Sequence, residues 1–540
     1  MKRRNIVLIG FMGSGKTEVG RKLAQVLGME FVDTDALIEQ QTQMSISDIF
    51  RKHGESYFRK LEMNIVDKVA KEEGLVISTG GGVPTFEENL KALRSNGLLF
   101  YLRTSPIAVW KRIKDATDRP LLDVSDRFTR IVELLESREP FYRRADIIVH
   151  TDKLTPDEVA SQIAAWVAAI PQGARAVPVC LEERTYHIII GNELYESIPK
   201  LLTAANLKEP FVLLTDEIVS SLHARLYAEA FRAYDKDLHF ITVPPGEMTK
   251  SLDYAIHLYD KLVELNMPRD GTLIALGGGV VTDLGGFVAA TYMRGIALVN
   301  APTTLLGQID AAIGGKVGVD HRRAKNLIGC FYQPKLVIAD ISTLKTLPER
   351  AYREGFAEAI KYGVIGDEEL FDFLERRSDA LLARDQEALM HVIRRCCEIK
   401  ARIVELDEEE RTDKRALLNY GHTFGHAIEV VTGYQQVLHG EAVAIGMVAA
   451  AHLSCMLGIC SNDMVERQTE VLRKYKLPTS LAEIGVTGIS ARQLYNAMAL
   501  DKKRRGKTLR FILPKRIGEA FVTDKPIEEQ LLVEVINTII

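Results

Sequence analysis

Several features of specialised protein classes are scarce or missing in this sequence. Only six cysteines occur among 540 residues, without a Cys-x-x-Cys pair or a framework spacing, so we expect reduced thiols in a cytoplasmic protein. No apolar stretch is long enough to span a bilayer, and the apolar run Ile6–Ile9 stops at Gly10, which indicates a buried strand rather than a signal peptide. The formal net charge of −4 gives no reason to expect a nucleic-acid or membrane-surface partner.

The length points to several domains, because 540 residues exceed what a single hydrophobic core supports. We predict an α/β protein of three parts: a domain with a parallel sheet over residues 1–172, an α/β lobe over 173–346, and a mainly helical lobe over 347–540. The stretch Ile170–Pro178 combines two prolines with a glycine. We interpret it as a short linker rather than a strand or a helix.

A glycine-rich loop follows the first predicted strand. The run Gly10-Phe-Met-Gly-Ser-Gly-Lys-Thr17 lies between that strand and a helical pattern that ends at Leu27, which is the context a Walker A motif requires. Backbone N–H groups of such a loop surround phosphate oxygens at a helix N-terminus. Lys16 would reach the transferred phosphate, and the Thr17 hydroxyl would coordinate Mg²⁺.

Further polar motifs follow later strands of this domain. Asp33 and Asp35 alternate at the end of a second predicted strand, so we expect both carboxylates on one side, near the phosphates. A helix cap is the structural alternative, and it explains only Asp35. Gly80–Gly82 follows another strand and allows a substrate to approach the backbone. Asp118 and Arg119 lie in a polar stretch that is typical of a lid.

Three histidines stand close together late in the chain. His422 and His426 are four residues apart, so both rings leave one face of a helix, and His439 follows a turn. Together with Glu358 these groups suit zinc, although capping or core histidines are the structural alternative. Spacing alone does not decide which three groups hold the metal.

The α/β lobe contains a second glycine-rich turn, Gly277–Gly279, which follows a predicted strand and suits a pyrophosphate at a helix N-terminus. By itself it is a weak dinucleotide motif. Cations then alternate with glycines at Arg294, Gly314–Lys316 and Lys325. They are either solvated loop positions or a site for a phosphorylated, acidic sugar, and their density favours the site.

Residues from about 1 to 170 resemble shikimate kinase. The resemblance depends on the order of the Gly10–Thr17 loop, Asp33-Thr-Asp35, Phe58-Arg59 with Glu62, Gly80–Gly82, Arg119-Pro-Leu-Leu and Arg138 before Pro140. It implies an ATP site that consists of Gly13, Ser14, Gly15, Lys16, Thr17, Arg112 and Arg119. It implies a shikimate site that consists of Asp35, Arg59, Gly81, Gly82 and Arg138. Asp33 would contact Mg²⁺ through water, and Asp35, Lys16 and Arg119 would be catalytic.

Residues from about 177 to the end resemble 3-dehydroquinate synthase. The motifs are Pro244–Lys250, Gly277–Asp283, Pro302-Thr-Thr304, Gly314-Gly-Lys316, Ala324-Lys-Asn326, Ala357–Tyr362, Arg415–His426 and Leu438–Glu441. The resemblance assigns zinc, with cobalt as the alternative, to Glu358, His422 and His439, and it places His426 near the substrate phosphate. Helical spacing would instead have paired His422 with His426.

The same resemblance implies the remaining contacts of the synthase. NAD would be bound by Asp216, Glu247, Lys250, Gly278, Gly279, Asp283, Thr303, Thr304, Lys316 and Lys325. The substrate would be bound by Asp310, Arg294, Lys316, Lys325, Asn326, Lys361, Arg415, Asn419 and His426, of which Lys361, Arg415 and His426 would be catalytic. Either Lys502 or Lys503 would also reach the substrate. A homodimer formed through the synthase unit is expected.

The implied function is bifunctional. One half would phosphorylate shikimate with ATP and Mg²⁺, and the other would convert 3-deoxy-D-arabino-heptulosonate 7-phosphate to 3-dehydroquinate and phosphate, with zinc and a recycled NAD. In one alternative only the synthase is active and the kinase domain is a binding module. In the other, the second half is a metal- and NAD-dependent polyol dehydrogenase. Retention of Lys16, Asp35 and Arg59 argues against the first, and Lys316 and Arg415 argue against the second.

Overall fold

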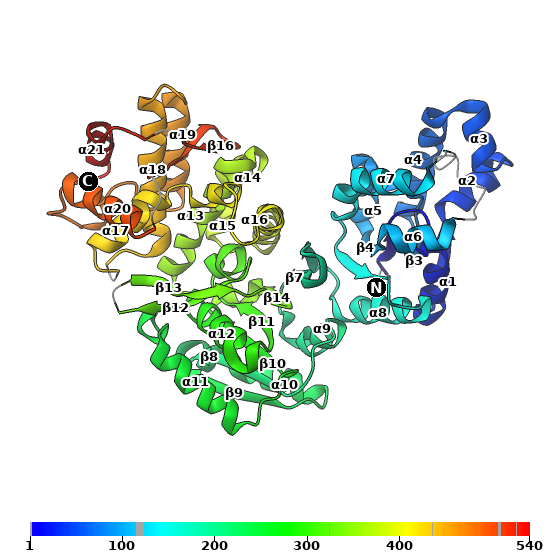
Figure 1. Cartoon of the computed structure of the whole chain (residues 1–540), viewed down its shortest axis with the longest axis horizontal. Coiled ribbons are helices and arrows are strands. Elements are labelled where there is room, and N and C mark those ends of the chain that lie inside the picture. Colours follow the sequence, from blue (N-terminus) through cyan, green and yellow to red (C-terminus); the bar gives the residue numbers. More distant parts are fainter. Residues whose placement is uncertain are drawn as a thin grey trace. The chain divides into compact units, whose positions relative to one another are not determined.

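The computed structural model describes residues 3–114, 124, 126–322, 324–434, 436–505, 509–524 and 526–540, without the side chains of 324 and 500–505. The chain forms two compact units (Figure 1). The first consists of Met1–His187 with Ser197–Asn206, and the second of Ile188–Glu196 with Leu207–Ile540. Residues 115–123, which include Asp118 and Arg119 of the predicted lid, lie outside the described part.

The first unit is built on a five-stranded sheet with the order β2-β3-β1-β4-β5, in which each printed pairing is parallel. Continuous apolar runs form its central strands because helices cover both faces. The strands are β1 (Asn5–Ile9), β2 (Glu30–Asp33), β3 (Leu75–Ser78), β4 (Gly97–Arg103) and β5 (Ile147–His150). The helices are α1 (Lys16–Leu27), α2 (Thr34–Thr42), α3 (Ile46–His53), α4 (Glu55–Lys71), α5 (Glu87–Asn96), α6 (Pro106–Ile113), α7 (Arg127–Tyr142), α8 (Pro156–Ala169) and α9 (Ile198–Ala204).

The predicted polar motifs of this unit follow the carboxyl ends of adjacent strands. The phosphate loop follows β1, Asp33 ends β2, and Gly80–Gly82 follows β3. Because β2, β3 and β1 are neighbours in a parallel sheet, all three motifs lie at one edge, where open α/β sheets bind ligands.

The prediction that Asp33 and Asp35 share one strand is wrong. Strand β2 ends at Asp33, which caps α2 by accepting the N–H groups of Asp35 and Ala36 at 3.0 and 3.3 Å. An aspartate at this position begins a helix because its carboxylate satisfies N–H groups that have no partner in the first turn. The capping residue is therefore Asp33, and Asp35 belongs to the first turn of α2.

The interpretation of Ile170–Pro178 as a linker is wrong for its second half. Only residues 171–174 form a turn, and Arg175–Val179 is strand β6. Pro178 lies inside β6, which ends the order of its sheet, and an edge strand tolerates a residue without an N–H group.

The second unit begins with an α/β lobe. Its strands belong to a sheet with the order β6-β7-β14-β11-β10-β8-β9, of which β6 and the first two residues of β7 fall within the residue range of the first unit. The pairings around β10 are parallel. The strands that follow β6 are β7 (Tyr186–Gly191), β8 (Phe211–Asp216), β9 (Leu238–Val243), β10 (Thr272–Gly277), β11 (Ala297–Pro302) and β14 (Leu336–Asp340), with a separate hairpin of β12 (Lys316–His321) and β13 (Ala324–Phe331). Its helices are α10 (Glu217–Ala233), α11 (Leu252–Glu264) and α12 (Gly279–Thr291).

The rest of the second unit is mainly helical, as predicted, and the α/β fold is confirmed. Its helices are α13 (Glu349–Gly366), α14 (Glu368–Arg376), α15 (Ser378–Leu382), α16 (Gln386–Leu406), α17 (His422–Val431), α18 (His439–Met456), α19 (Asn462–Lys474), α20 (Ala491–Arg505) and α21 (Glu529–Asn537). One small hairpin consists of β15 (Ile512–Arg516) and β16 (Glu519–Val522). Within the described residues, every helix is too short or too polar to cross a membrane.

Candidate active sites

The phosphate loop of the first unit holds its lysine at the N-terminus of α1. The Lys16 ammonium donates to the carbonyl oxygens of Gly10 and Phe11, each at 2.9 Å, and the residue is 8% exposed. Gly13 has a left-handed φ of 76°, and a Cβ there would lie 2.6 Å from Ile113 Cγ2, so the loop requires glycine. A buried cation at a helix N-terminus is suited to bind a polyphosphate.

Oxygen ligands for a hard cation lie next to this loop. The Thr17 hydroxyl donates to Asp33 Oδ2 at 2.8 Å, which joins the start of α1 to the end of β2. A hydroxyl and a carboxylate at the edge of a phosphate site are the groups that Mg²⁺ prefers. The structure thus brings together the two residues that the sequence predicts for magnesium.

A group of polar side chains adjoins Gly80–Gly82. Arg59 on α4 donates from Nη1 to Glu62 Oε2 at 2.9 Å, and a Cβ at Gly82 would lie 2.2 Å from Arg59 Nη1. A Cβ at Gly80 would lie 2.6 Å from Asp35 Oδ1. The glycines therefore leave space that these side chains fill.

Glu62 is the buried carboxylate of this group. Burial raises its pKa to about 7, although Arg59 opposes this shift. The motif that resembles shikimate kinase includes Glu62, yet sequence reasoning did not assign it to the site.

The remaining predicted arginines lie near the phosphate loop and near Gly80–Gly82. Arg138 on α7 lies 6.0 Å from the Phe11 ring, and the nearby Tyr142 hydroxyl donates to the Gly81 carbonyl at 2.6 Å. Arg112 on α6 donates to the Gly13 carbonyl at 3.3 Å, which places its guanidinium against the phosphate loop. Arg119 lies outside the described residues.

In the second unit, three potential metal ligands meet from three helices. Glu358 on α13, His422 at the start of α17 and His439 at the start of α18 each offer a ligand atom, and these atoms lie within 4.8 Å of one another. His422 Nε2 and His439 Nε2 lie 3.5 and 3.8 Å from Glu358 Oε1. The Glu358 carboxylate is fully buried. One carboxylate and two imidazoles form a suitable donor set for a divalent transition metal.

Both imidazoles are oriented through their other nitrogen. His422 Nδ1 lies 3.1 Å from the Tyr420 carbonyl, and His439 Nδ1 lies 3.1 Å from Glu429 Oε1. Such contacts fix the tautomer that leaves Nε2 free to bind a metal. Sequence reasoning missed Glu429, although its position seven residues after His422 places both on one helix face.

His426 lies beside this cluster rather than between its ligands. Its ring centroid is 5.4 Å from that of His422 and 6.3 Å from that of His439.

Buried cations surround the cluster. Lys361 forms an ion pair with Glu358 one turn away on α13. Lys400 on α16 donates to Asp310 Oδ1 at 2.5 Å, and burial lowers the pKa of Lys400 to about 8. Lys400 is a third residue that sequence reasoning missed, because nothing in its local sequence distinguishes it from other lysines of an amphipathic helix.

Arg415 is fully buried behind Gly314. Its Nη2 donates to the Gly314 carbonyl at 3.0 Å. Gly314 has a φ of 93°, and a Cβ at this position would lie only 2.8 Å from Arg415 Nη2, so the position requires glycine. Lys316 forms an ion pair with Glu410. Asn419 ends the 3-10 turn that Arg415 begins, three residues before His422.

The predicted dinucleotide residues follow adjacent strands of the α/β lobe. Gly277 of β10 pairs with Pro302 of β11, so Gly278 and Gly279 lie beside Thr303 and Thr304. Gly278 caps the N-terminus of α12, and a Cβ there would lie 3.3 Å from Thr304 Cγ2. This helix N-terminus at the carboxyl end of parallel strands suits a pyrophosphate.

A network of ions extends from this helix. Lys250 donates to Asp283 Oδ2 and to Asn326 Oδ1, both at 2.5 Å. Lys325 lies 3.1 Å from Glu247 Oε1 and 4.6 Å from the centroid of the Tyr434 ring.

Four other predicted residues lie apart from these networks or outside the described side chains. Asp216 caps α10 at the end of β8, and Arg294 lies exposed in a turn after α12. The side chains of Lys502 and Lys503 lie outside the described part of the structure.

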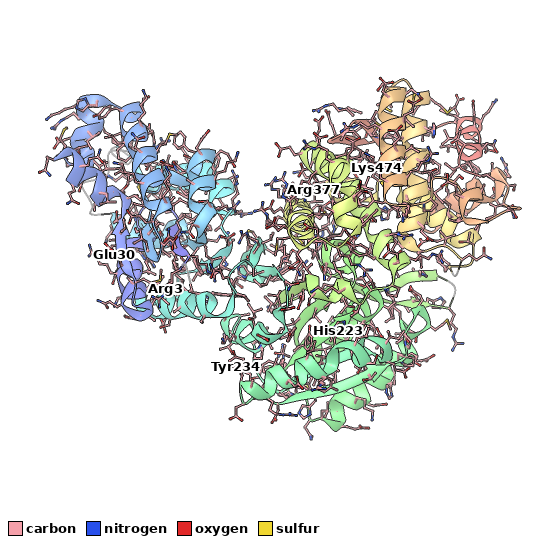
Figure 2. The ribbon with its side chains drawn as sticks, turned by 180° about the vertical axis from the view of Figure 1, so that it is seen from behind. Arg3, Glu30, His223, Tyr234, Arg377 and Lys474 are labelled. Carbon is pink, nitrogen blue, oxygen red and sulfur yellow. The ribbon has the colours of Figure 1, made fainter. Side chains whose placement is uncertain are left out.

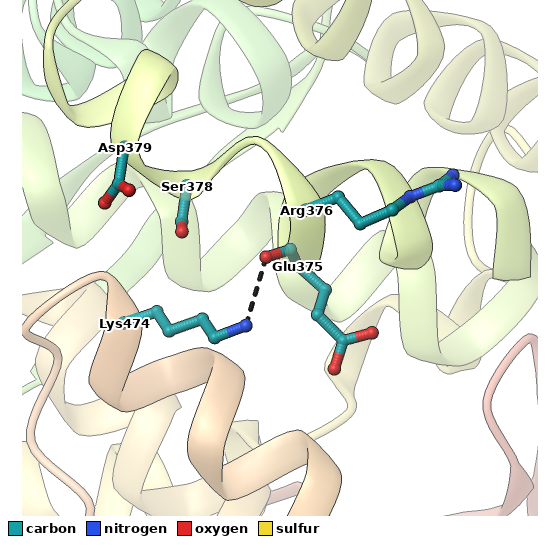
Figure 3. A pocket seen from close by; sticks show the side chains of 5 residues that line it. All are labelled: Glu375, Arg376, Ser378, Asp379 and Lys474. Carbon is teal, nitrogen blue, oxygen red and sulfur yellow. Dashed lines mark hydrogen bonds between the residues drawn. The ribbon is translucent and has the colours of Figure 1, made fainter.

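Two regions of the second unit that are visible in the figures have no functional assignment. A surface depression of about 440 Å³ is lined by Glu375, Arg376, Ser378, Asp379 and Lys474 (Figure 3). Its acidic and basic side chains balance, and Lys474 donates to the Glu375 carbonyl at 3.2 Å. His223 on α10 (Figure 2) lies 3.0 Å from the Thr346 hydroxyl, which is a structural contact.

Models of known families match parts of both units. The shikimate kinase family model matches residues 12–168. The models of the N-terminal and C-terminal parts of 3-dehydroquinate synthase match residues 240–354 and 355–504. A 3-dehydroquinate synthase from Syntrophotalea carbinolica is 42% identical over 359 residues, which cover 66% of this chain and 98% of that protein.

Solved structures resemble the second unit. A 2-epi-5-epi-valiolone synthase from Streptomyces hygroscopicus, with NAD⁺ and Zn²⁺ bound, is 28% identical, with a TM-score of 0.61 over 67% of this chain and 98% of that one. A 2-deoxy-scyllo-inosose synthase complexed with carbaglucose-6-phosphate, NAD⁺ and Co²⁺ is 25% identical, with a TM-score of 0.62 over 68% of this chain and 100% of that one.

Proposed function

The chain belongs to the 3-dehydroquinate synthase family and carries a shikimate kinase domain before it, and we propose that it catalyses one reaction of the shikimate pathway with each. The kinase phosphorylates shikimate with ATP, and the synthase converts 3-deoxy-D-arabino-heptulosonate 7-phosphate to 3-dehydroquinate and phosphate. The observation that carries the proposal is the convergence of Glu358, His422 and His439 in the second unit, together with an intact phosphate loop in the first.

In the kinase, the protein positions the reactants and neutralises charge rather than forming a covalent bond. Lys16, which donates to its loop carbonyls in this structure, would bind the transferred phosphate, and Thr17 and Asp33 would hold Mg²⁺. Asp35 orients the attacking hydroxyl of shikimate, and Arg59 and Arg138 bind its carboxylate. Arg112 and Arg119 bind ATP.

The synthase site fits a divalent metal, because Glu358 is fully buried and the Nε2 atoms of His422 and His439 lie 3.5 and 3.8 Å from its Oε1. Glu358, His422 and His439 would hold the metal, which would supply polarisation of a substrate hydroxyl, and a bound NAD would supply reversible hydride transfer. Glycines at the N-terminus of α12 fit the pyrophosphate of that dinucleotide.

The chain's own cations perform the electrostatic part of the synthase reaction. Lys361, Lys400 and Arg415 are each at least nine-tenths buried, so their attraction for an anionic substrate is poorly screened. Lys400, with its pKa lowered to about 8, can exchange a proton near neutral pH. Burial opposes ionisation of Asp310, but Lys400 and Lys361 hold its pKa well below the usual range, so it stays an acceptor. We propose that His426, whose ring lies beside that of His422, contacts the leaving phosphate.

We propose 1–172, 173–346 and 347–540 as the limits of the three functional parts, in a cytoplasmic protein without nucleic-acid or membrane partners. A homodimer through the synthase unit is supported by an exposed apolar stripe on α11. Its members Leu252, Ile256 and Val263 are 43, 56 and 63% exposed, and a second copy of the chain would cover them.

Two matched variants of the full-length chain test the proposal. Lys16→Ala should abolish ADP formation from ATP and shikimate and leave phosphate release from the heptulosonate phosphate unchanged. Glu358→Gln should abolish phosphate release from the heptulosonate phosphate and leave ADP formation from ATP and shikimate unchanged. Loss of both activities in either variant would contradict two independent sites, and net NADH formation on simple polyols would favour the dehydrogenase alternative.

A further inference from the structure

The first unit contains residues that lie outside the matched kinase region. The shikimate kinase family model ends at residue 168, yet the unit extends to His187 and includes Ser197–Asn206. Residues 175–187 and 197–206, here called the added segment, contain β6, the start of β7, and α9.

The added segment satisfies the open edge of the kinase sheet. Strand β5 ends the order of that sheet, so its outer N–H groups have no strand partner there. The Ile148 N–H donates instead to His187 Nε2 at 3.0 Å, and this histidine is 7% exposed. Burial lowers the pKa of His187 to about 3, so the ring is neutral and Nε2 is an acceptor.

The added segment also contributes apolar packing to the kinase. The His187 ring lies edge-on to Trp166 of α8, with centroids 5.3 Å apart. Cys180 belongs to the same buried cluster as the core strands of the kinase sheet. Helix α9 packs against α8, and its residues Ile198, Leu201 and Leu202 are fully buried.

We propose that the added segment is a structural part of the kinase, which therefore depends for its stability on sequence that follows its own family region. A buried N–H group without a partner and an uncovered apolar face both destabilise a domain. The kinase therefore loses stability when it is separated at the turn near Gly173, although that turn is the boundary between the functional parts.

Tryptophan fluorescence can test this in the intact protein without relying on kinase activity. The chain has two tryptophans, Trp110 and Trp166, and both belong to the first unit. His187→Leu retains an apolar side chain and removes the acceptor, whereas His187→Gln can restore an acceptor. We expect His187→Leu to lower the midpoint of the fluorescence-monitored thermal transition by about 3–10 °C, and His187→Gln to recover part of the loss.

A matched control is His223→Leu, which removes another buried, hydrogen-bonded histidine, but from the second unit. It should leave the tryptophan transition within about 1 °C. An unchanged midpoint in His187→Leu, or an equal shift in His223→Leu, would overturn the proposal.

Cleavage of the backbone gives a second readout. A protease site introduced at the exposed turn Gln172–Gly173 allows the folded full-length protein to be cut before the added segment. The two fragments should co-elute in gel filtration with the tryptophan transition close to that of the uncut protein, and His187→Leu should promote their separation. Separation of the unsubstituted fragments without denaturant would show that the segment is only a connection.

Discussion

Substitution of Glu429 is the sharpest test of how the second site holds its metal. The carboxylate is 9% exposed and lies 3.1 Å from His439 Nδ1, so it fixes the imidazole orientation and increases the basicity of Nε2. A hydrogen bond to a charged group contributes roughly 1.5–3 kcal/mol. Each 1.4 kcal/mol corresponds to about a tenfold change in affinity. Glu429→Gln keeps an acceptor and removes the charge, so we expect about tenfold weaker zinc binding, and about 100-fold for Glu429→Leu.

The assay is competition for zinc against a chromophoric chelator, which measures metal affinity without turnover. Glu354→Gln is the matched control, because Glu354 accepts the Gly440 N–H at 3.1 Å beside His439 while glutamine can accept the same bond. It should change zinc affinity less than about threefold. Equal affinity in Glu429→Leu and the unsubstituted protein would refute the orienting role, as would an equal loss in Glu354→Gln.

Four further outcomes are expected. Lys16→Ala should lower kinase kcat by at least about 100-fold in the shikimate and ATP assay, because the phosphate loses its buried cation. A zinc-selective chelator should abolish phosphate release by the synthase while the kinase, supplied with Mg²⁺, keeps its activity. Lys400→Met should lower synthase kcat/KM about 100-fold, and a decrease below about threefold would remove Lys400 from the site. The pKa of Glu62 in the folded state, about 7, exceeds its value in the unfolded state, so ionisation of Glu62 opposes folding. The stability of the first unit should therefore rise as pH falls from above 7 toward 4.5. In Glu62→Gln, fluorescence-monitored unfolding should lose that pH dependence.

The kinase half was accessible from sequence because its motifs are local. A strand, a glycine loop and a helix follow one another between Ile6 and Leu27, and each part is encoded by its own residues. The prediction failed after Asp33, because this residue caps α2 and the strand therefore ends two residues earlier than predicted. Boundaries depend on such single hydrogen bonds, which periodicity does not reveal.

The metal cluster shows the opposite case. Helical spacing favoured His422 with His426, whereas the structure joins ligands from the starts of two helices to a residue in the middle of a third. Glu358 was one candidate ligand among four, only tertiary packing brings it within reach of the histidines, and the resemblance to a family, rather than spacing, selected it. Lys400 and Glu429 stayed unassigned because their contacts with Asp310 and His439 span 90 and 10 residues of the chain.

One turn of α13 presents both an acid and the base that neutralises it. Glu358 and Lys361 are three residues apart on α13, so any rotation or translation of this helix moves both side chains together. A single residue inserted between Ala359 and Ile360 would swing one about 100° away from the other. An insertion or deletion within this turn would therefore separate the ion pair, whereas a substitution of Glu358 or Lys361 leaves the spacing of the two positions intact.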